Sequence, residues 1–339
     1  MISESNRTRK TSGKITLADV AKFVGVGSMT VSRALRTPEV VSEDLRKKIE
    51  KAVIELGYVP NFSARQLASA SSKNLVIVTS SITSTENTLI LSALNKSISE
   101  LELQMVILVA NEKYWLRELI NHSPQAIILL NFDCSPNAIK WIKQSGIPTI
   151  EIGAKQQNPI NINIGIDSRV SMQHMINFLL NKGHKEIGLL SSNQDLSIFQ
   201  KYLESWHTTL LKKHVNPHLI YHSAEKISFS TGASLFNDAI LEWGKVDALV
   251  FLSDELACGA LYEAHRKHFS IPNDMAIVSL GGLDVGSVSY PKLTTISIPY
   301  EKMGILAGQK LVDIIKGNIS ALDKIIIDMP TSLIERDSA

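Results

Sequence analysis

Residues 25–42, GVGSMTVSRALRTPEVVS, bring cationic and hydrogen-bonding side chains into one short segment. At helical spacing, one face of this segment gathers four residues: Ser28, Met29, Ser32 and Arg33. An arginine can bridge O6 and N7 of guanine in the major groove, and a methionine offers an apolar surface to a thymine methyl. Serine and threonine hydroxyls, with Thr30 among them, suit phosphate oxygens. The pattern predicts a helix that lies on DNA; an ordinary solvated helix face is the alternative.

Three short helices are expected to hold this face in place. The first begins at Thr16, which forms a T-x-x-D capping box with Asp19, and it ends at Gly25. The second begins at Ser28 and ends before a Thr-Pro pair. The third opens at Ser42 and carries two acidic residues at its positive end. Two short helices joined by a tight glycine turn are typical of a helix-turn-helix domain.

A hinge is predicted after the third helix, in the segment YVPNFSARQLASASSK, residues 58–73. Pro60 breaks the chain, Asn61 can cap a short helix that runs through Leu67, and a serine-rich linker follows. A helix this short is unstable alone and would expose Leu67. The leucine can wedge between base pairs in the minor groove when two copies meet on DNA. The alternative is that it packs on the neighbouring domain.

Residues 74–339 alternate short apolar strands with helices. Nine strands are predicted: 74–80, 104–110, 126–131, 148–152, 162–166, 186–191, 247–252, 275–280 and 293–298. Helices are expected between them, for example over 88–101, 138–144 and 170–181. Apolar strands separated by helices favour parallel sheets that are covered on both faces, and this many strands favour two doubly wound subdomains. Ligands of such folds bind at the carboxyl ends of the strands, which here means the cleft between the subdomains.

Charge is unevenly distributed along the 339 residues, whose net charge is only +2. Residues 1–73 hold 13 Lys and Arg against 7 Asp and Glu, whereas residues 74–339 hold 22 against 26. A basic head on a mildly acidic body is typical of a nucleic-acid-binding module with a separate regulatory body. No apolar run reaches transmembrane length, and the N-terminus lacks the apolar core of a signal peptide. We therefore expect a cytoplasmic protein with no membrane partner.

The head resembles the lactose-repressor family of bacterial transcription regulators. Four segments carry the resemblance in order and spacing: TLADVAKFVGVGSMTVSRAL (16–35), VS (41–42), LGYVPN (56–61) and ARQLA (64–68). Looser similarity continues through 179–190, 253–261 and 271–296, and SMTVSR is most similar to the gluconate and idonate repressors. The resemblance implies a periplasmic-binding-protein-like body whose chain crosses between its subdomains three times. It also implies further DNA contacts at Thr16, Tyr58, Asn61, Ala64 and Leu67.

The same resemblance implies an effector pocket in the cleft of the body. It assigns seven residues to this pocket: Ser80, Glu151, Lys201, Tyr202, Ser253, Asp254 and Gly281. Tyr202 stands where the family has a sugar-binding Arg, Ser253 where it has Asn, and Gly281 where it has Asp. Lys201 adjoins Tyr202 and could supply a cation. A sugar acid or its phosphate is the first expectation for the effector; other carbohydrates come second, and a sensor without a ligand third.

These observations predict an α/β protein in three parts: a small all-α helix-turn-helix head (14–60), a hinge helix and linker (61–73), and an effector-sensing and dimerisation body (74–339). The predicted function is sequence-specific repression of carbohydrate or sugar-acid utilisation genes by a homodimer on a near-palindromic double-stranded DNA operator. Helices near 88–101 and 113–120 are candidate dimer surfaces. Cys134 and Cys258 suggest neither a disulfide framework nor a zinc site, and no cofactor or metal is expected.

Two alternatives remain at this point, and a third, a periplasmic binding protein, is rejected. The body could belong to a regulator that has lost carbohydrate binding. A periplasmic binding protein would need a signal peptide and would have no DNA-binding head. A sugar-modifying enzyme fused to such a head would need a catalytic constellation, and the sequence shows no G-x-S-x-G elbow, H-E-x-x-H motif or P-loop.

Overall fold

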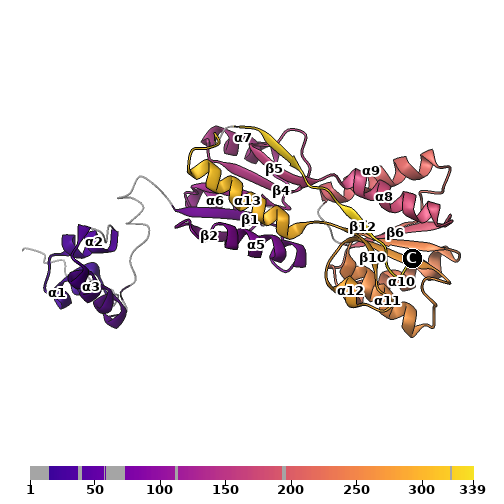
Figure 1. The fold of residues 1–339 in the computed structure, drawn as a ribbon, viewed down its shortest axis with the longest axis horizontal. Helices are drawn as coiled ribbons and strands as arrows, with labels where there is room; N and C mark the ends of the chain where they lie inside the picture. Colours follow the sequence, from indigo (N-terminus) through magenta and orange to yellow (C-terminus); the bar gives the residue numbers. More distant parts are fainter. Residues whose placement is uncertain are drawn as a thin grey trace, which may run out of the picture. The chain divides into compact units, whose positions relative to one another are not determined.

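The computed structural model describes residues 15–36, 40–56, 58, 73–110, 114–192, 196–320 and 323–339. Contacts divide the chain into two compact units, Met1–Ser72 and Lys73–Ala339, which are coloured along the sequence in Figure 1. The first unit is helical, and the second contains two mainly parallel sheets, so the predicted fold class is confirmed. Most of the predicted hinge, including Asn61, Ala64 and Leu67, lies outside the described residues.

The first unit contains the three expected helices, α1 (Leu17–Val24), α2 (Ser28–Arg36) and α3 (Glu43–Leu56). Each helix contributes a fully buried aliphatic side chain to one small core: Val20, Val31 and Ile49. Apolar residues three or four apart along each helix supply this core, because such residues share one helix face. The opposite face of α2 is thereby turned to solvent.

Helix α1 begins and ends as its sequence predicts. The Thr16 hydroxyl oxygen accepts a hydrogen bond from the Asp19 N–H at 3.4 Å, and the Asp19 carboxylate accepts one from the Thr16 N–H at 2.8 Å. This reciprocal pair is the capping box. Gly25 ends the helix with φ = 78°, a left-handed conformation that glycine adopts without a steric penalty.

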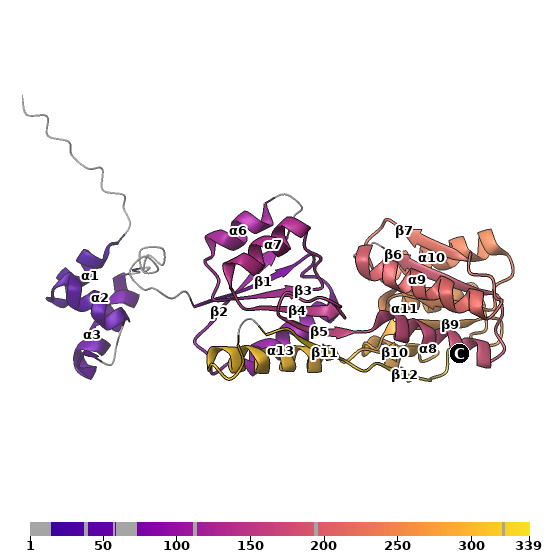
Figure 2. The ribbon, with the colours of Figure 1, turned by 90° about the horizontal axis from the view of Figure 1, so that it is seen from above.

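The first sheet of the second unit has six strands, and all its neighbouring pairs are parallel. In sheet order they are β11 (Ile325–Asp328), β5 (Ile162–Ile166), β4 (Thr149–Ala154), β3 (Ala126–Leu130), β1 (Asn74–Thr79) and β2 (Gln104–Val109). Helices α5 (Thr85–Ser97) and α13 (Tyr300–Ile315) cover one face, and α6 (Trp115–Asn121) and α7 (Pro136–Ser145) cover the other (Figure 2). Alternate residues of each strand supply the two cores.

The second sheet also has six strands. In sheet order they are β12 (Ser332–Ile334), β10 (Thr294–Ser297), β9 (Ala276–Gly281), β8 (Ala248–Phe251), β6 (Ile187–Ser192) and β7 (Ile220–Ser223), and only the β10–β12 pair is antiparallel. One face packs on α8 (Ser168–Asn181) and α9 (Leu196–Lys212). The other packs on α10 (Phe229–Trp243), α11 (Asp254–Arg266) and the short α12 (Val285–Val288) (Figure 1).

The chain passes between the two sheets three times, after β5, after β10 and after β11. Each sheet therefore depends on segments that are far apart in the sequence. The last residues belong to the second sheet, where Ser338 is fully buried. Its hydroxyl donates to the Ile277 carbonyl oxygen at 2.5 Å and accepts from the Thr294 N–H at 2.8 Å.

All nine predicted strands are present, with ends that differ by at most two residues. The helix expected over 88–101 begins earlier, at Thr85, because the Ser84 side chain caps it by accepting from the Asn87 N–H at 3.3 Å. Strands β7, β11 and β12 were not predicted. Among the helices that the structure describes, none has the length and apolar character that a membrane crossing requires.

Candidate nucleic-acid interface and effector cleft

Helix α2 presents the side chains that the sequence assigns to DNA reading. Met29 is 76% exposed, and Ser28 and Arg33 are also exposed. Val31 and Ala34 are buried on the opposite side and fix the helix to the core. Helix α2 contains no acidic residue, so no carboxylate on the helix itself opposes a phosphate backbone.

Other predicted DNA contacts in the first unit also have structural roles. Thr16 is exposed, and its hydroxyl takes part in the cap of α1. Tyr58 is half-buried against the core of the three helices, and its N–H donates to the Val53 carbonyl oxygen at 3.0 Å. Thr30 and Ser32 are half-buried on α2. At the start of α2, the Gly27 carbonyl oxygen accepts from the Thr30 N–H at 2.9 Å.

A cavity of about 740 Å³ lies within the second unit, a volume that suits a small-molecule ligand. We call it the cleft. On one side its lining comes from the loop after β1, the start of α5 and the carboxyl ends of β3 and β4. On the other side the lining comes from α9, the start of α11 and the carboxyl ends of β8 and β9. Both sheets therefore contribute the edge at which doubly wound folds bind ligands.

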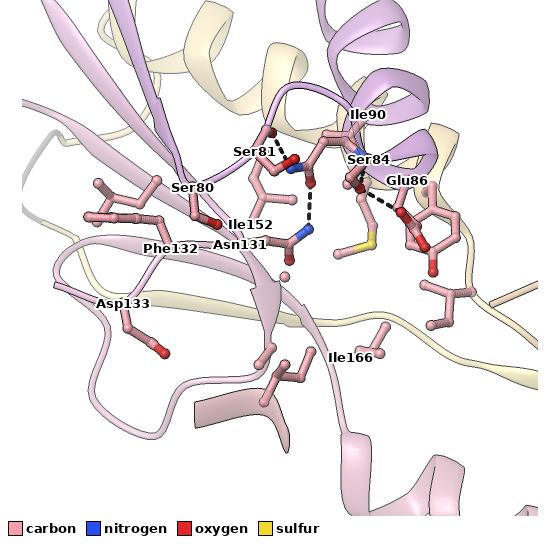
Figure 3. Close-up of a pocket in the computed structure, with 18 of the residues that line it drawn as sticks. Ser80, Ser81, Ser84, Glu86, Ile90, Asn131, Phe132, Asp133, Ile152 and Ile166 are labelled. Carbon is pink, nitrogen blue, oxygen red and sulfur yellow. Dashed lines mark hydrogen bonds between the residues drawn. The ribbon is translucent and has the colours of Figure 1, made fainter. Parts of the chain in front are cut away.

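A buried amide network shapes the wall formed by the first sheet (Figure 3). The Asn87 side-chain nitrogen donates to the Thr79 hydroxyl at 3.1 Å and to the Ser81 carbonyl oxygen at 2.9 Å. Its side-chain oxygen accepts from the Asn131 side-chain nitrogen at 2.7 Å. Asn131 has φ = 44°, in the left-handed region, and a Cβ on Gly153 would lie 2.3 Å from the Asn131 amide oxygen. Glycine is therefore required opposite Asn131.

The cleft is lined by four carboxylates and one cation: Glu86, Asp133, Glu151, Glu255 and Lys226. Its lining contains no arginine or histidine among the described residues. Burial raises the pKa of the Glu151 carboxyl, although the hydrogen bond from the Ile160 N–H, at 2.6 Å, opposes this shift. Burial, followed by the charges of Glu151 and Asp133, raises the pKa of the neighbouring Cys134 thiol to about 12. That thiol is therefore protonated at neutral pH.

Three of the seven predicted pocket residues line the cleft: Ser80, Glu151 and Tyr202. Ser80 is exposed at the end of β1. Tyr202 is only 4% exposed and packs in the core around α8 and α9. Burial raises the pKa of its phenol to about 12, so the side chain that stands at the expected arginine position is uncharged.

The other four predicted residues, Lys201, Ser253, Asp254 and Gly281, are absent from the described lining of the cleft. Asp254 is fully buried, and its carboxylate accepts from the Ser279 and Thr295 hydroxyls and from the Leu283 N–H. Burial raises the pKa of this carboxyl. These hydrogen bonds of the Asp254 carboxylate connect the start of α11 to β9 and β10. Gly281 packs against the Asp254 carboxylate, since a Cβ at Gly281 would lie 3.0 Å from it.

Ser253 and Lys201 are also absent from the lining, and the local helix geometry explains why. Ser253 is the N-cap of α11, and its hydroxyl accepts from the Glu255 N–H at 3.2 Å. Lys201 precedes the inward-facing Tyr202 on α9, and adjacent helical residues point in different directions.

Sequence reasoning missed most of the polar lining, including Glu86, Asn87, Asn131, Asp133, Lys226 and Glu255. A signal for three of them was present. Asn131 directly follows the apolar strand β3, whereas Glu86 and Glu255 lie in the first turns of helices that follow β1 and β8. Those positions lie at the carboxyl edge of a parallel sheet. In the described part of the chain, no group of His, Cys, Asp and Glu side chains is placed to hold a metal ion.

A helix-turn-helix unit and a two-sheet body with a polar cleft define the class of ligand-responsive DNA-binding regulators. Residues 16–61 match the profile of bacterial regulatory proteins of the lacI family, and residues 176–339 match a periplasmic binding protein-like domain. The HTH-type transcriptional regulator GntR of Escherichia coli K12 is 30% identical over 307 residues, which cover 89% of this chain and 92% of that protein. The chain belongs to the lacI family of bacterial regulatory proteins.

Solved structures of the family have the same fold. A LacI-family transcriptional regulator from Silicibacter pomeroyi superposes with a TM-score of 0.86 at 23% identity, covering 96% of this chain and 99% of that one. The lac repressor dimer bound to operator and the anti-inducer ONPF superposes with a TM-score of 0.75 at 24% identity, covering 96% of this chain and 99% of that one. The described part of the chain therefore has the fold of these regulators.

Proposed function

We propose that this protein represses carbohydrate or sugar-acid utilisation genes by binding a near-palindromic operator as a homodimer, and that a small molecule in the cleft controls the binding. The observation that carries the proposal is the exposed face of α2, with Ser28, Met29 and Arg33, on a chain whose second unit contains a polar cleft. In this reading, Arg33 bridges a guanine and Met29 contacts a thymine methyl.

The remaining predicted contacts would position the protein on DNA. The hydroxyls of Ser28, Thr30 and Ser32 suit phosphate oxygens, which fix orientation without reading sequence. We assign Thr16, Tyr58, Asn61 and Ala64 to the same group on the family resemblance. Leu67 is assigned to the operator centre, where an apolar wedge would kink the DNA at the minor groove.

A second copy of the chain is the partner that we propose for the body. Exposed apolar side chains gather on and beside α11 and α12: Tyr262 at 73%, Val288 at 74% and Tyr290 at 83% exposed. Large exposed apolar side chains that lie together are typical of protein interfaces. The lac repressor structure named above is a dimer on its operator, which supports a second copy here. Twofold symmetry of the protein would be mirrored in the DNA.

Control by the cleft follows from the two-sheet construction of the body. The Thr85 hydroxyl, at the start of α5, donates to the Glu255 carboxylate on α11 at 2.7 Å, so this bond joins the two subdomains. A ligand that binds one arrangement of the subdomains better shifts the population toward it by the difference in affinity. The shift would change the spacing of the two hinges in the dimer, and with it the affinity for the operator. We place this regulation in the cytoplasm, with no catalytic turnover.

Selection from random double-stranded DNA with the purified full chain tests the proposal. The expected result is enrichment of a near-palindromic site with half-sites about one helical turn apart. Sedimentation should show a dimer in the complex. A bound pool without symmetry, or no enrichment over a salt-sensitive background of non-specific binding, would contradict the proposed function.

A further inference from the structure

The amide network of the cleft fixes a hydrogen-bond acceptor in its wall. The Ser81 carbonyl oxygen can only accept, so the Asn87 side-chain nitrogen must face it, at 2.9 Å. The Asn87 oxygen consequently faces Asn131 and accepts from its side-chain nitrogen at 2.7 Å. This leaves the Asn131 amide oxygen on the side away from Asn87, as Figure 3 shows. The Ser81 carbonyl oxygen thus fixes the orientation of the Asn87 amide, and the Asn87 amide in turn fixes the orientation of the Asn131 amide.

Asn131 is held in this position at a cost. Its φ of 44° is a left-handed conformation that few residues adopt, and such conformations cluster at functional sites. The neighbouring Asn163 differs, because its side-chain nitrogen donates to the Glu151 and Ala154 carbonyl oxygens and its oxygen accepts from the Gln156 N–H. The hydrogen-bonding groups of Asn163 are therefore used within the protein, whereas the Asn131 oxygen lies against Gly153 and accepts no hydrogen bond among the described contacts.

The carboxylates of the cleft add more acceptors. One Glu86 oxygen accepts from the Ser84 hydroxyl at 2.5 Å, and one Glu255 oxygen accepts from the Thr85 hydroxyl at 2.7 Å. Across the described residues, none of the four carboxylates forms an ion pair with a lysine or arginine. In Figure 3, Glu86 and Asp133 lie on opposite sides of Asn131, so the carboxylates are spread along the wall of the cleft.

Charge and hydrogen bonding therefore favour the same kind of ligand. With four carboxylates and a single lysine in the lining, an anion that enters the cleft meets like charge. Asp133 is exposed, whereas Glu86, Glu151 and Glu255 are partly buried. A partly buried carboxylate without a cationic partner is costly, and a bound cation offsets that cost. An ammonium group has three donors and no acceptor, which matches a wall rich in oxygen acceptors. Tyr202 stands where the family resemblance places a sugar-binding arginine, so the cleft lacks that cation.

We propose that the cleft binds a small polyhydroxylated molecule that carries a protonated amine, such as an amino sugar, and not a sugar acid. This inference rests on the proposed role of the cleft as the effector site. The ammonium group faces the carboxylates of the lining, Glu86 and Asp133 among them, and the hydroxyl groups of the ligand contact the serines of the loop after β1. The apolar residues of the lining cover the carbon skeleton.

Calorimetry on the full chain with matched sugars tests the inference. The probes are the 2-amino-2-deoxy sugar, the neutral hexose and the aldonic acid of the gluco, galacto and manno series. In at least one series the amino sugar should bind about tenfold more tightly than its neutral and acidic counterparts. Its affinity should fall as the pH rises through the pKa of its own amine, because the ligand then loses its charge.

Two variants locate the charge, and a third is the matched control. Glu86→Gln and Asp133→Asn keep the shape of each side chain and remove its charge, so each should weaken the amino sugar about tenfold and leave neutral hexoses within about twofold. Glu118→Gln removes an exposed carboxylate on α6, outside the cleft, and should change nothing.

Several outcomes would overturn the inference. Tightest binding of an aldonic acid, equal binding within every series, or unchanged amino-sugar affinity in both cleft variants would each do so. Absence of binding by every probe would overturn it as well. If the protein still selects a palindromic operator in that case, the DNA-binding function stands and only the assignment of the ligand fails.

Discussion

Arg33 and Met29 lie on the same helix face, and the proposed function assigns them two different kinds of contact with DNA. The guanidinium of Arg33 can make two hydrogen bonds to one guanine, whereas Met29 offers dispersion contacts to a methyl group. We expect Arg33→Ala to weaken operator binding by about 1–3 kcal/mol and to relax specificity at one position of each half-site. Competition binding with a library of operator variants measures both effects.

Lys51→Ala is a matched control for this substitution, because Lys51 is an exposed cation on α3 of the same unit. It should leave specificity intact. If Arg33→Ala and Lys51→Ala weaken every DNA sequence equally, Arg33 acts through phosphates alone and the assignment of base reading is wrong.

The residues that line the cleft were harder to predict than the residues on the exposed face of α2. A helix face follows from spacing alone, whereas a cleft residue must also point in the right direction. The family resemblance assigned Asp254 and Gly281 to the ligand pocket, but a glycine has no side chain to offer a ligand. The Asp254 carboxylate instead turns to the hydroxyls of Ser279 and Thr295. Asn131 could have been found from its place directly after β3, but the orientation of its side chain depends on Asn87, which lies 44 residues earlier in the sequence.

At the scale of elements, the cap of α1 gives a test of the DNA-binding unit. Thr16→Ala removes the hydroxyl that accepts from the Asp19 N–H, and such a loss typically costs about 1 kcal/mol of helix stability. Amide exchange in α1 should become faster, and Thr16→Ser, which keeps the hydroxyl, should restore protection. Unchanged exchange in Thr16→Ala would show that the cap does not limit the stability of α1.

The same cap makes a prediction about pH. Hydrogen bonds from Thr16 hold the pKa of the Asp19 carboxyl below its ordinary value. A carboxylate whose pKa is depressed by folding stabilises the folded state above its unfolded pKa, and the contribution is lost as the pH falls through the folded value. The difference in α1 exchange between Thr16→Ala and the unaltered chain should therefore shrink in acid.

The strands that the sequence did not predict share one property. β7, β11 and β12 lie at sheet edges and have at most four residues each, and all their described side chains are half-buried or exposed. An edge strand has only one neighbour, so its sequence carries a weaker apolar signal than a central strand. β1 and β3, which are buried along their whole length, were predicted to within one residue. A parallel strand that is buried on both faces can be predicted from the sequence because it is a continuous apolar run.

At the scale of the whole molecule, the hydrogen bond between Thr85 and Glu255 offers a way to change the balance between the arrangements of the two subdomains. Thr85→Val keeps the branched shape and removes the hydroxyl that donates at 2.7 Å. Loss of a hydrogen bond of this kind costs about 0.5–1.5 kcal/mol. We expect the affinity for any cleft ligand to fall by about two- to tenfold, because the bridged arrangement becomes less populated.

Thermal unfolding of the Thr85→Val chain without ligand separates this effect from general destabilisation. The midpoint should move little, since Thr85 is exposed. Thr88→Val is the matched control, because Thr88 is an exposed threonine on α5 outside the lining of the cleft, and its hydroxyl donates to the Ser84 carbonyl oxygen of its own subdomain at 3.0 Å. Equal ligand affinity in the Thr85→Val and unaltered chains would mean that this bond does not couple the subdomains.

The three passages between the sheets also have a consequence for the order in which a newly made chain can fold. The three helices of the first unit have been synthesised by residue 56, whereas the first sheet waits for β11, at residues 325–328. Until α13 has been synthesised, Ile90 and Leu94 on α5 lack the partners that bury them in the finished protein. At bacterial synthesis rates of about 5–20 residues per second, this interval lasts for roughly ten seconds or more. During translation, the DNA-binding unit therefore exists for some time before the sensor that regulates it.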